Sequence, residues 1–464
     1  MKTTRNFSQR RAPRRSAILS CAMIVALLAT FANSFSALAA GRAARSGASP
    51  GAGAATPAVR LIPPDGTMFL TDQRFDIRAE APAGMSGPLV VRLDGRDITE
   101  WNNRSRLTGK DANRPASPPL NGGPAFISRD WSFPNPGRHS LRATVGGAAA
   151  SEVSFEIVGW RGNASGVRNV ILLIGDGMGV AHRTAARIVS RGLLEGRYRN
   201  GMLEMDKMEA TGFVTTSSFS ATVTDSSPGA SCYATGNKAA NNEEGVYPDN
   251  TDNDALKGTD PESDRFFDNP RVENISEYLH RTRGVNVGLI TTADVTDATP
   301  AAFAVHTSNR SASTRIADDY FDRRDETGLT VLMGGGRQWF EPKVEGGKGG
   351  ARRGTPTNPR VNPARNLLGE FRSADFMFAD SADALRSASA RRPRKLLGLF
   401  SAGTMPVAFD KLGRGAERAA NVPMLDDMAR AGLESISASS PRGFFLMIEG
   451  ASIDKQTHFM DPDR

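Results

Sequence analysis

The sequence predicts an α/β protein, a three-layer sandwich with a mostly parallel central sheet, preceded by a small all-β, sandwich-like domain. Three observations lead to this prediction. Residues 57–160 hold short runs in which apolar and polar residues alternate, as in half-buried strands. From residue 166, near-continuous apolar runs alternate with helical patterns. Polar residues able to carry chemistry follow several of these runs, where ligands bind in parallel sheets.

The first forty residues have the pattern of an export signal. A basic stretch, "RRAPRR", precedes the apolar run "AILSCAMIVALLATFA", and "ALA" at Ala37–Ala39 fits a cleavage site. We expect a signal peptide over residues 1–39, a flexible linker over 40–56, and a periplasmic or secreted protein. The apolar run is too short and too rich in small residues for stable membrane insertion. The Arg14–Arg15 pair leaves the Sec and twin-arginine routes open.

Charge and cysteine content narrow the function classes. The net charge is +8, but residues 1–54 carry eight basic residues and no acidic ones, so the remaining chain is balanced. A balanced chain has no whole-molecule attraction for polyanions, and we therefore expect no nucleic-acid partner. Removal of the signal peptide leaves Cys232 as the one cysteine, which excludes an internal disulfide.

The β-domain is predicted over residues 57–160. The runs "LVVRLDG", "HSLRATVG" and "EVSFEIVGW" alternate apolar and polar residues, with Pro and Gly between them. This pattern favours short antiparallel strands in a sandwich. Apart from His139, the region has no cluster that suggests chemistry, so a packing or adhesive role is expected.

The α/β domain is predicted over residues 166–464. Its buried strands are expected at residues 169–175, 284–292, 328–336 and 443–450, and "AHRTAARIVSRGLL" has helical periodicity. Strands that alternate with helices favour a mostly parallel sheet with helices on both faces. Two long polar stretches, residues 247–264 and 341–359, are predicted to be surface insertions.

Asp176 lies at the tip of the first predicted strand, inside "GDGMG". The flanking glycines allow a tight turn and the close approach of a ligand. A carboxylate there would repel a pyrophosphate unless a cation lay between them, so we interpret Asp176 as a metal ligand. An aspartate that caps the next helix is the alternative.

The stretch "TDSSPGASCYATGNK" predicts a helix start, with Ser227 as N-cap and Pro228 at the first helical position. Ser226 would then lie at a helix N-terminus, which favours an anion, and could attack phosphorus. The chain has five His and none nearby, which favours metal-assisted deprotonation over a catalytic triad. A plain Asp-Ser helix cap is the alternative.

Two further clusters follow predicted strands. Asp297 and Thr299 offer hard oxygen donors for Mg²⁺ or its waters, and Arg310 offers a planar fork of donors for phosphate. In "EGASIDKQTH", Glu449 ends the last strand, and Asp454 and His458 share a helix face, as part of a Zn²⁺ site would. A surface arginine and an ordinary contact on a surface helix are the alternatives.

Taken together, the motifs resemble the alkaline phosphatase family. They are "NVILLIGDGMG", "TDSSPGASCYATGNK", "ATPAAFAVHTSNR", "LMGGGR" and "MIEGASIDKQTH", in the family's order over residues 169–458. The resemblance implies an alkaline-phosphatase-like fold and hydrolysis of small phosphomonoesters. A phosphodiesterase is a related alternative, which the Arg310 clamp argues against. Family members are often homodimers.

The resemblance also implies two Zn²⁺ and one Mg²⁺. Asp176 would bridge the Mg²⁺ and one Zn²⁺, and Thr299 and Glu449 would complete the protein ligands of the Mg²⁺. Asp454 and His458 would bind the other Zn²⁺. The full set of implied metal ligands is Asp176, Ser226, Thr299, Glu449, Asp454 and His458.

The same resemblance implies the roles at the phosphate. Ser226 would be the nucleophile that forms a phosphoserine, and Arg310 would clamp the phosphate oxygens. Asp297 and Lys455 match the bacterial form, in which they act through water on Mg²⁺ and phosphate.

The family carries an Asp-His pair and a further His beyond the last of these motifs, whereas this chain ends at Arg464. We therefore expect an incomplete site and sheet. A non-catalytic remnant that binds Mg²⁺ or phosphate is the alternative function.

Overall fold

The computed structural model describes residues 59–105, 114, 116–146, 149–159, 166–343, 350–354, 361–414 and 419–460. The predicted signal peptide and linker lie outside these residues. The described residues all belong to one compact unit, Pro57–Arg464. Among them, no helix is long and apolar enough to cross a membrane.

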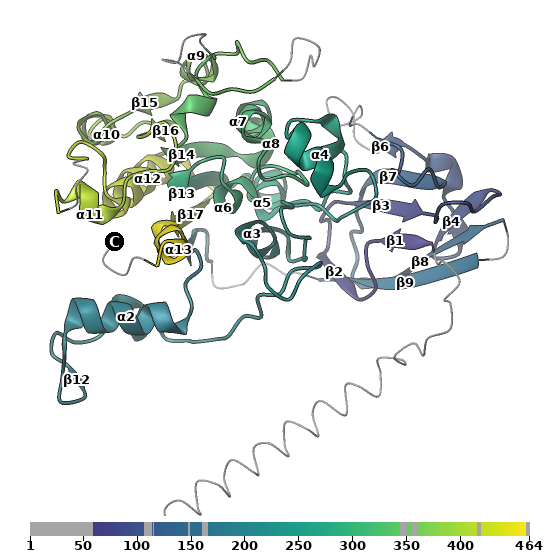
Figure 1. Cartoon of the computed structure of the whole chain (residues 1–464), viewed down its shortest axis with the longest axis horizontal. Helices are drawn as coiled ribbons and strands as arrows, with labels where there is room; N and C mark the ends of the chain where they lie inside the picture. Colours follow the sequence, from purple (N-terminus) through teal and green to yellow (C-terminus); the bar gives the residue numbers. More distant parts are fainter. Residues whose placement is uncertain are drawn as a thin grey trace, which may run out of the picture. The chain divides into compact units, whose positions relative to one another are not determined.

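The β-domain consists of two sheets whose inner faces share one apolar core (Figure 1). Phe69 and Phe75 stack in this core with ring centroids 3.9 Å apart. Most strand pairs are antiparallel, as expected, but two pairs, β2–β9 and β6–β7, are parallel. One sheet has the order β1-β3-β7-β6 and the other β2-β9-β8-β4-β5. The strands are β1 (Arg60–Ile62), β2 (Thr67–Leu70), β3 (Phe75–Glu80), β4 (Leu89–Leu93), β5 (Arg96–Asp97), β6 (Arg104–Ser105), β7 (Ala125–Trp131), β8 (Gly137–Val145) and β9 (Ala149–Val158).

The α/β domain is built on a parallel sheet of six strands in the order β10-β17-β13-β14-β16-β15. The predicted fold class, an α/β sandwich after a β-domain, is therefore confirmed. The strands are β10 (Val170–Gly175), β13 (Asn286–Asp294), β14 (Leu329–Gly335), β15 (Met377–Ala379), β16 (Leu396–Leu399) and β17 (Phe444–Gly450). Because all six run the same way, their carboxyl ends lie along one edge of the sheet.

Helices cover both faces of this sheet (Figure 1). Successive side chains of a strand point to opposite faces, and on β13 Leu289 belongs to one apolar core and Ile290 to the other. The core around Leu289 packs against α3, α6, α7 and α9, and the core around Ile290 packs against α10 and α12. The helices are α2 (Val180–Arg191), α3 (Ser226–Thr235), α4 (Asp254–Thr259), α5 (Ile275–Arg283), α6 (Ala298–Ala301), α7 (Ser313–Asp322), α8 (Arg324–Thr327), α9 (Leu367–Ser373), α10 (Ala382–Ser389), α11 (Ala408–Lys411), α12 (Leu425–Ser439) and α13 (Ser452–His458).

The first strand of the α/β domain departs from its prediction. Residues 169–175 were expected to be buried on both faces, but Leu173 on β10 is 63% exposed. Among the described residues β10 pairs only with β17, which makes it an edge strand. Exposed apolar side chains continue beyond it, and we call residues 167–223 the apolar segment. Its most exposed members are Val167, Leu173, Val180, Val189, Met208, Phe213, Val214 and Val223.

The two predicted surface insertions are more buried than expected. In residues 247–264, Thr251 is fully buried and bonds Asp268 at 3.0 Å, and α4 forms part of the stretch. In residues 341–359, the described Arg352 is also fully buried and donates to Asp318 at 2.7 Å. Partners distant in sequence satisfy these two polar groups, so the prediction of a surface position was wrong for Thr251 and Arg352. Residues 253–255, 258–260, 351 and 353 are exposed, as expected.

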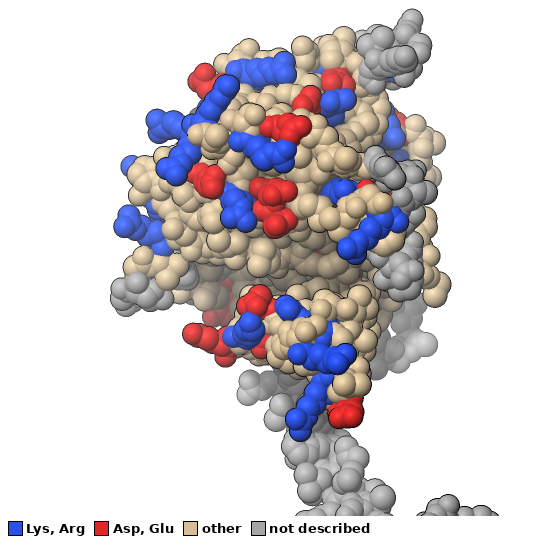
Figure 2. Space-filling view, turned by 90° about the vertical axis from the view of Figure 1, so that its left-hand side faces the viewer, with Lys and Arg blue, Asp and Glu red and all other residues tan. Residues whose placement is uncertain are grey.

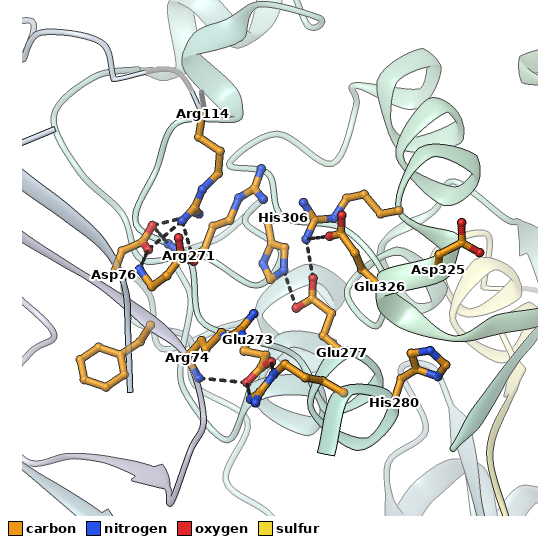
Figure 3. Close-up of a pocket in the computed structure, with 14 residues that line it drawn as sticks. Arg74, Asp76, Arg114, Arg271, Glu273, Glu277, His280, His306, Asp325 and Glu326 are labelled. Carbon is orange, nitrogen blue, oxygen red and sulfur yellow. Dashed lines mark hydrogen bonds and ion pairs between the residues drawn. The ribbon is translucent and has the colours of Figure 1, made fainter. Parts of the chain in front are cut away.

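A charged pocket lies between the β-domain and the α/β domain. Phe75 of β3 forms an isolated β-bridge with Val272, so the two domains are joined through backbone pairing. Beside this bridge is a cavity of about 250 Å³, which we call the interdomain pocket (Figure 3). Its charged lining includes Arg74, Asp76, Arg114, Arg271, Glu273, Glu277, Arg281, His306 and Arg323.

Surface charge of both signs is mixed on the face shown in Figure 2. Lys and Arg side chains lie between Asp and Glu side chains over the described residues of this face. Opposite charges at such short range largely cancel each other's field beyond a Debye length.

Candidate active site

A cavity of about 800 Å³ lies at the carboxyl ends of β10 and β17. It is the place where a parallel sheet binds ligands. Seven of the nine site residues predicted from the sequence line it: Asp176, Ser226, Thr299, Arg310, Asp454, Lys455 and His458. The other two, Asp297 and Glu449, lie just behind the lining and contact residues of the cavity wall.

Ser226 and Asp176 are in direct contact. The Ser226 hydroxyl donates to the Asp176 carboxylate, 3.0 Å from each oxygen. Burial and the nearby Asp454 raise the pKa of Asp176, and the Ser226 hydrogen bond opposes them. A serine hydroxyl is thus directed at a carboxylate that forms no ion pair within the described part of the chain, although Lys455 is near enough to lower its pKa.

Helix α3 begins earlier than predicted. Its N-cap is Asp225, whose carboxylate accepts from the backbone N–H of Ser227 at 2.7 Å, so the prediction of Ser227 as N-cap was wrong. Asp225 is favoured as the N-cap because its other carboxylate oxygen also accepts a hydrogen bond from the backbone N–H of Asn242 at 2.6 Å. Ser226 is therefore the first helical residue in place of Pro228, although it lies at the helix N-terminus, as expected. Pro228 still lies in the first turn, where its missing N–H costs nothing.

Gly177 lets the tip of β10 approach α13. Its φ is +62°, a left-handed conformation that glycine adopts without strain. A Cβ at this position would lie 2.7 Å from the Asp454 Oδ1, which is closer than atoms can pack. The glycine therefore allows Asp176 and Asp454 to share one cavity.

Arg310 is held in place by two carboxylates. Its Nη1 donates to Asp225 at 3.1 Å, and its Nη2 donates to Asp297 at 2.6 Å. The ammonium of Lys455 binds the other oxygen of Asp297 at 2.6 Å. Burial opposes the ionisation of Asp297, but Arg310 and Lys455 outweigh it and lower its pKa to about 2. The two cations are thus fixed side by side at the cavity wall.

Glu449 is a buried acid at the end of β17. It is 1% exposed, and it accepts a hydrogen bond from Thr291 on β13 at 2.5 Å. Burial raises its pKa to about 8 with help from Asp176, while the hydroxyls of Thr291 and Thr299 act in the opposite direction. Asp176, Thr299 and Glu449 therefore form a group of oxygen donors short of positive charge, which suits a hard cation such as Mg²⁺.

The Asp454–His458 pair lies on α13, as its spacing predicted. The His458 Nε2 is 3.3 Å from the Asp454 carboxylate, and the His458 side chain is 76% exposed. Among the described residues, no three His, Cys, Asp or Glu side chains form a group that could hold a metal ion. Each predicted metal site includes at most two side chains of these types, so each depends on further donors.

Comparison with known proteins identifies the family. Residues 167–464 match the family model described as alkaline phosphatase. The chain belongs to the alkaline phosphatase family. It is 30% identical over 308 residues to alkaline phosphatase 3 of Bacillus subtilis, covering 65% of this chain and 54% of that one. It is 32% identical over 340 residues to streptomycin-6-phosphate phosphatase of Streptomyces griseus, covering 65% of this chain and 67% of that one.

Among solved structures, that of Thermus thermophilus alkaline phosphatase matches with 25% identity and a TM-score of 0.49. The match covers 64% of this chain and 52% of that one. The chain thus spans about half the length of the Bacillus relative and of this structure.

This alkaline phosphatase family member also has site residues that the sequence reasoning missed. Asp225 caps α3 and anchors Arg310, and Thr291 holds Glu449. The signal for Asp225 was its position directly before the predicted nucleophile. Thr291 carried no signal, because its partner is 158 residues away.

Proposed function

We propose that this chain hydrolyses phosphate monoesters through Ser226. The observation that carries the proposal is the contact of the Ser226 hydroxyl with Asp176 at the N-terminus of α3, in the same cavity as Arg310. A helix N-terminus favours the negative charge of a phosphate. The fork of Arg310 supports binding of two non-bridging oxygens, which a monoester offers.

The reaction assigned to these residues has two displacements. The Ser226 Oγ bonds to phosphorus as the bond from phosphorus to the ester oxygen breaks, and a phosphoserine forms. The proton of the Ser226 hydroxyl ends on the released alcohol. Water then attacks the phosphoserine, which releases inorganic phosphate and restores the Ser226 hydroxyl. Arg310 keeps the phosphate in place through both steps, and Asp225 and Asp297 keep Arg310 in place.

The proposed cofactors are two Zn²⁺ and one Mg²⁺. The donor set fits cations, because Asp176 and Glu449 are carboxylic acids whose pKa values are raised by burial and by neighbouring acids, and neither forms an ion pair among the described residues. Asp176, Thr299 and Glu449 would hold the Mg²⁺, and Asp454 and His458 would contribute to one Zn²⁺. When bound, such ions stabilise negative charge on the attacking and leaving oxygens.

The substrates we propose are small phosphomonoesters. One similar protein is named for a phosphate ester of streptomycin, which supports this class. Export to the periplasm or the medium remains a prediction from the first 39 residues, and a homodimer remains a prediction from the family resemblance.

The deciding experiment is hydrolysis of a chromogenic aryl phosphate at alkaline pH by the purified chain, with Zn²⁺ and Mg²⁺ added, beside Ser226→Ala. We expect hydrolysis by the parent and its loss in Ser226→Ala, with a matching loss of ³²P incorporation from labelled substrate. Equal hydrolysis by both proteins would disprove the role of Ser226. No hydrolysis by either, with retained phosphate binding, would favour the non-catalytic remnant.

A further inference from the structure

One face of helix α3 leads from the proposed nucleophile to an aromatic side chain in the same cavity. The residues of α3 that line the cavity are Ser226, Gly229, Ala230 and Tyr233. Counted from Ser226, the other three lie three, four and seven positions along the chain, a spacing that places all four on one face of a helix. This face therefore borders the cavity over two helical turns.

The cavity has open space beside α3, between Ser226 and Tyr233. The rise of an α-helix places the backbone of Tyr233 roughly 10 Å further along the axis than that of Ser226. A Cβ built on Gly229 would meet no side chain within 4 Å other than those of its chain neighbours, so the Tyr233 ring does not fold back over this turn. The cavity volume of about 800 Å³ is that of a pocket for a drug-sized molecule. A phosphate at Ser226 thus leaves room for the group to which it is esterified.

The chemistry of this face favours an uncharged aromatic group. Tyr233 is 50% exposed, whereas Ala230 and Ala234 of the same helix are buried. Helix α3 has no charged residue, so it offers a charged group no partner for an ion pair. A half-exposed ring in a cavity can take a second ring in the offset or edge-to-face arrangements that aromatic pairs prefer.

Phe459 is the other aromatic side chain among the described residues that line the cavity. It is 78% exposed, lies at the C-cap of α13, and follows His458, a proposed Zn²⁺ ligand. Tyr233 belongs instead to the helix that carries the proposed nucleophile, so the helix itself fixes its distance from the phosphate. We therefore assign the binding of an aromatic group to Tyr233.

We propose that Tyr233 is a specificity-determining residue, which stacks on a planar, uncharged aromatic group that a flexible spacer joins to the phosphate. A nucleoside monophosphate has this form, with a base, a ribose spacer and a terminal phosphate monoester. An aryl phosphate carries its ring directly on the ester oxygen, nearer to Ser226 than to a residue roughly 10 Å along α3. The proposal rests on the proposed function, in which Ser226 and Arg310 act on the phosphate.

The test compares the binding of AMP and of ribose 5-phosphate, which lacks the base. Titration calorimetry uses the full chain with Zn²⁺ and Mg²⁺ present and with Ser226→Ala, which prevents turnover. AMP should bind about tenfold more tightly than ribose 5-phosphate, as expected for a base stacked on an aromatic side chain. Addition of Tyr233→Ala should bring the two affinities within about twofold of each other, and Tyr233→Phe should keep the difference, because phenylalanine retains the ring.

Kinetics with Ser226 intact separate ring binding from a structural role. In Tyr233→Ala the KM for AMP should rise about tenfold with little change in kcat, because stacking far from phosphorus is equal in the ground and transition states. A structural role would instead lower kcat for AMP and ribose 5-phosphate alike, which would contradict the proposal. Should Tyr233→Ala fail to fold, Gly229→Leu, which fills the open space beside α3, is expected to remove the preference for AMP.

Two control variants complete the design. Tyr198→Ala changes a tyrosine of β12 that does not line the described cavity, and it should keep the preference for AMP. Phe459→Ala tests the other aromatic side chain. Loss of the preference in Phe459→Ala and its retention in Tyr233→Ala would overturn the assignment to Tyr233.

Failure of the proposal differs from failure of the proposed function. Equal affinity for AMP and ribose 5-phosphate in a chain that hydrolyses both would overturn the role of Tyr233 and keep the proposed function. A preference for AMP that depends on Tyr233, without hydrolysis of either ester when Ser226 is intact, would keep ring binding and overturn the proposed function. A chain that binds neither ester nor inorganic phosphate would overturn both.

Discussion

The candidate active site and the interdomain pocket are lined by the same kinds of charged side chain, but their buried carboxyl groups have different partners. Asp76 of the interdomain pocket accepts hydrogen bonds from Arg114 and Arg129 at 2.9 to 3.1 Å, and Glu277 accepts from Arg323 at 2.7 Å and lies 3.0 Å from the His306 Nε2. Figure 3 shows Arg114 beside Asp76 and His306 beside Glu277. In the candidate active site, by contrast, Asp176 and Glu449 accept hydrogen bonds from hydroxyl groups, and neither forms an ion pair among the residues that the structure describes.

The pKa values of these buried carboxyl groups differ between the two sites. Burial opposes the ionisation of Asp76, but Arg114 and Arg129 outweigh it and lower its pKa to about 2. Glu277 follows the same logic, because His306 and Arg323 lower its pKa despite complete burial. Burial prevails at Glu449 and raises its pKa to about 8. Asp76 and Glu277 each pair with basic side chains of their own domain, whereas no ion pair involves Asp176 or Glu449 among the described residues, which leaves room for cations.

The largest expected effect is loss of stability in Asp76→Asn. This change leaves the buried Arg114 and Arg129 without their shared carboxylate, which should cost about 3 to 5 kcal/mol of unfolding free energy. Urea unfolding of the purified chain measures it. Asp94→Asn, which removes a more exposed partner of His139, is the matched control and should cost less than about 1 kcal/mol. If Asp76→Asn also cost less than about 1 kcal/mol, the paired carboxylate of the interdomain pocket would not stabilise the chain more than an exposed one, which would contradict the comparison.

Next in size is the effect of Asp176→Asn on catalysis. Hydrolysis of an aryl phosphate should fall on the order of 100-fold, because a proposed cation ligand in contact with Ser226 is lost. Stability of the metal-free chain should stay level or rise, because a carboxylate disfavoured by burial and by Asp454 disappears. Urea unfolding that shows a loss like that of Asp76→Asn would contradict this.

Lowering the pH should remove the contribution of Asp76, in the interdomain pocket, to the stability of the folded chain. The pKa of Asp76 is about 2 in the folded chain, below the roughly 3.9 of an unfolded aspartate. Its contribution, about 2 kcal/mol, is therefore complete above about pH 4 and is lost as the pH falls toward about 2. Melting temperatures across this range should drop more steeply in the parent than in Asp76→Asn. Parallel curves would mean that other carboxylates govern acid unfolding.

The smallest expected effect is stabilisation by metal ions. At ten times its dissociation constant a ligand adds about 1.4 kcal/mol of stability, so Mg²⁺ should raise the melting temperature by a few degrees. Glu449→Gln should lose most of this gain, because Glu449 is a proposed Mg²⁺ ligand. Asp76→Asn, measured from its own lower baseline, should keep the gain; an equal loss in both variants would point to nonspecific ion binding.

The active site was easier to predict from the sequence than the interdomain pocket. Asp176 and Glu449 each follow an apolar run directly, and parallel strands bring such positions to one edge of the sheet. Asp76 gives no local signal, because it accepts from the Arg271 backbone 195 residues away. A hydrogen bond between domains depends on how the domains pack, which a local pattern does not encode.

Two errors in the fold prediction have the same origin. Asp225, Ser226 and Ser227 are all good N-cap residues, and only the distant Asn242 selects Asp225. Likewise, the apolar run of β10 reads like that of a central strand, yet its place in the sheet depends on which strands pair with it. Local composition defines an element's type, and long-range contacts define its boundaries and its neighbours.

The apolar segment, residues 167–223, which includes the edge strand β10, has a consequence for handling the protein. The described part of this region exposes both unpaired backbone groups and large apolar side chains, with Phe213 at 93% exposure. A free sheet edge beside an apolar surface is a template for aggregation. Light scattering from the purified chain should therefore grow with concentration faster than for an ideal solute, and dilute conditions suit every measurement proposed above.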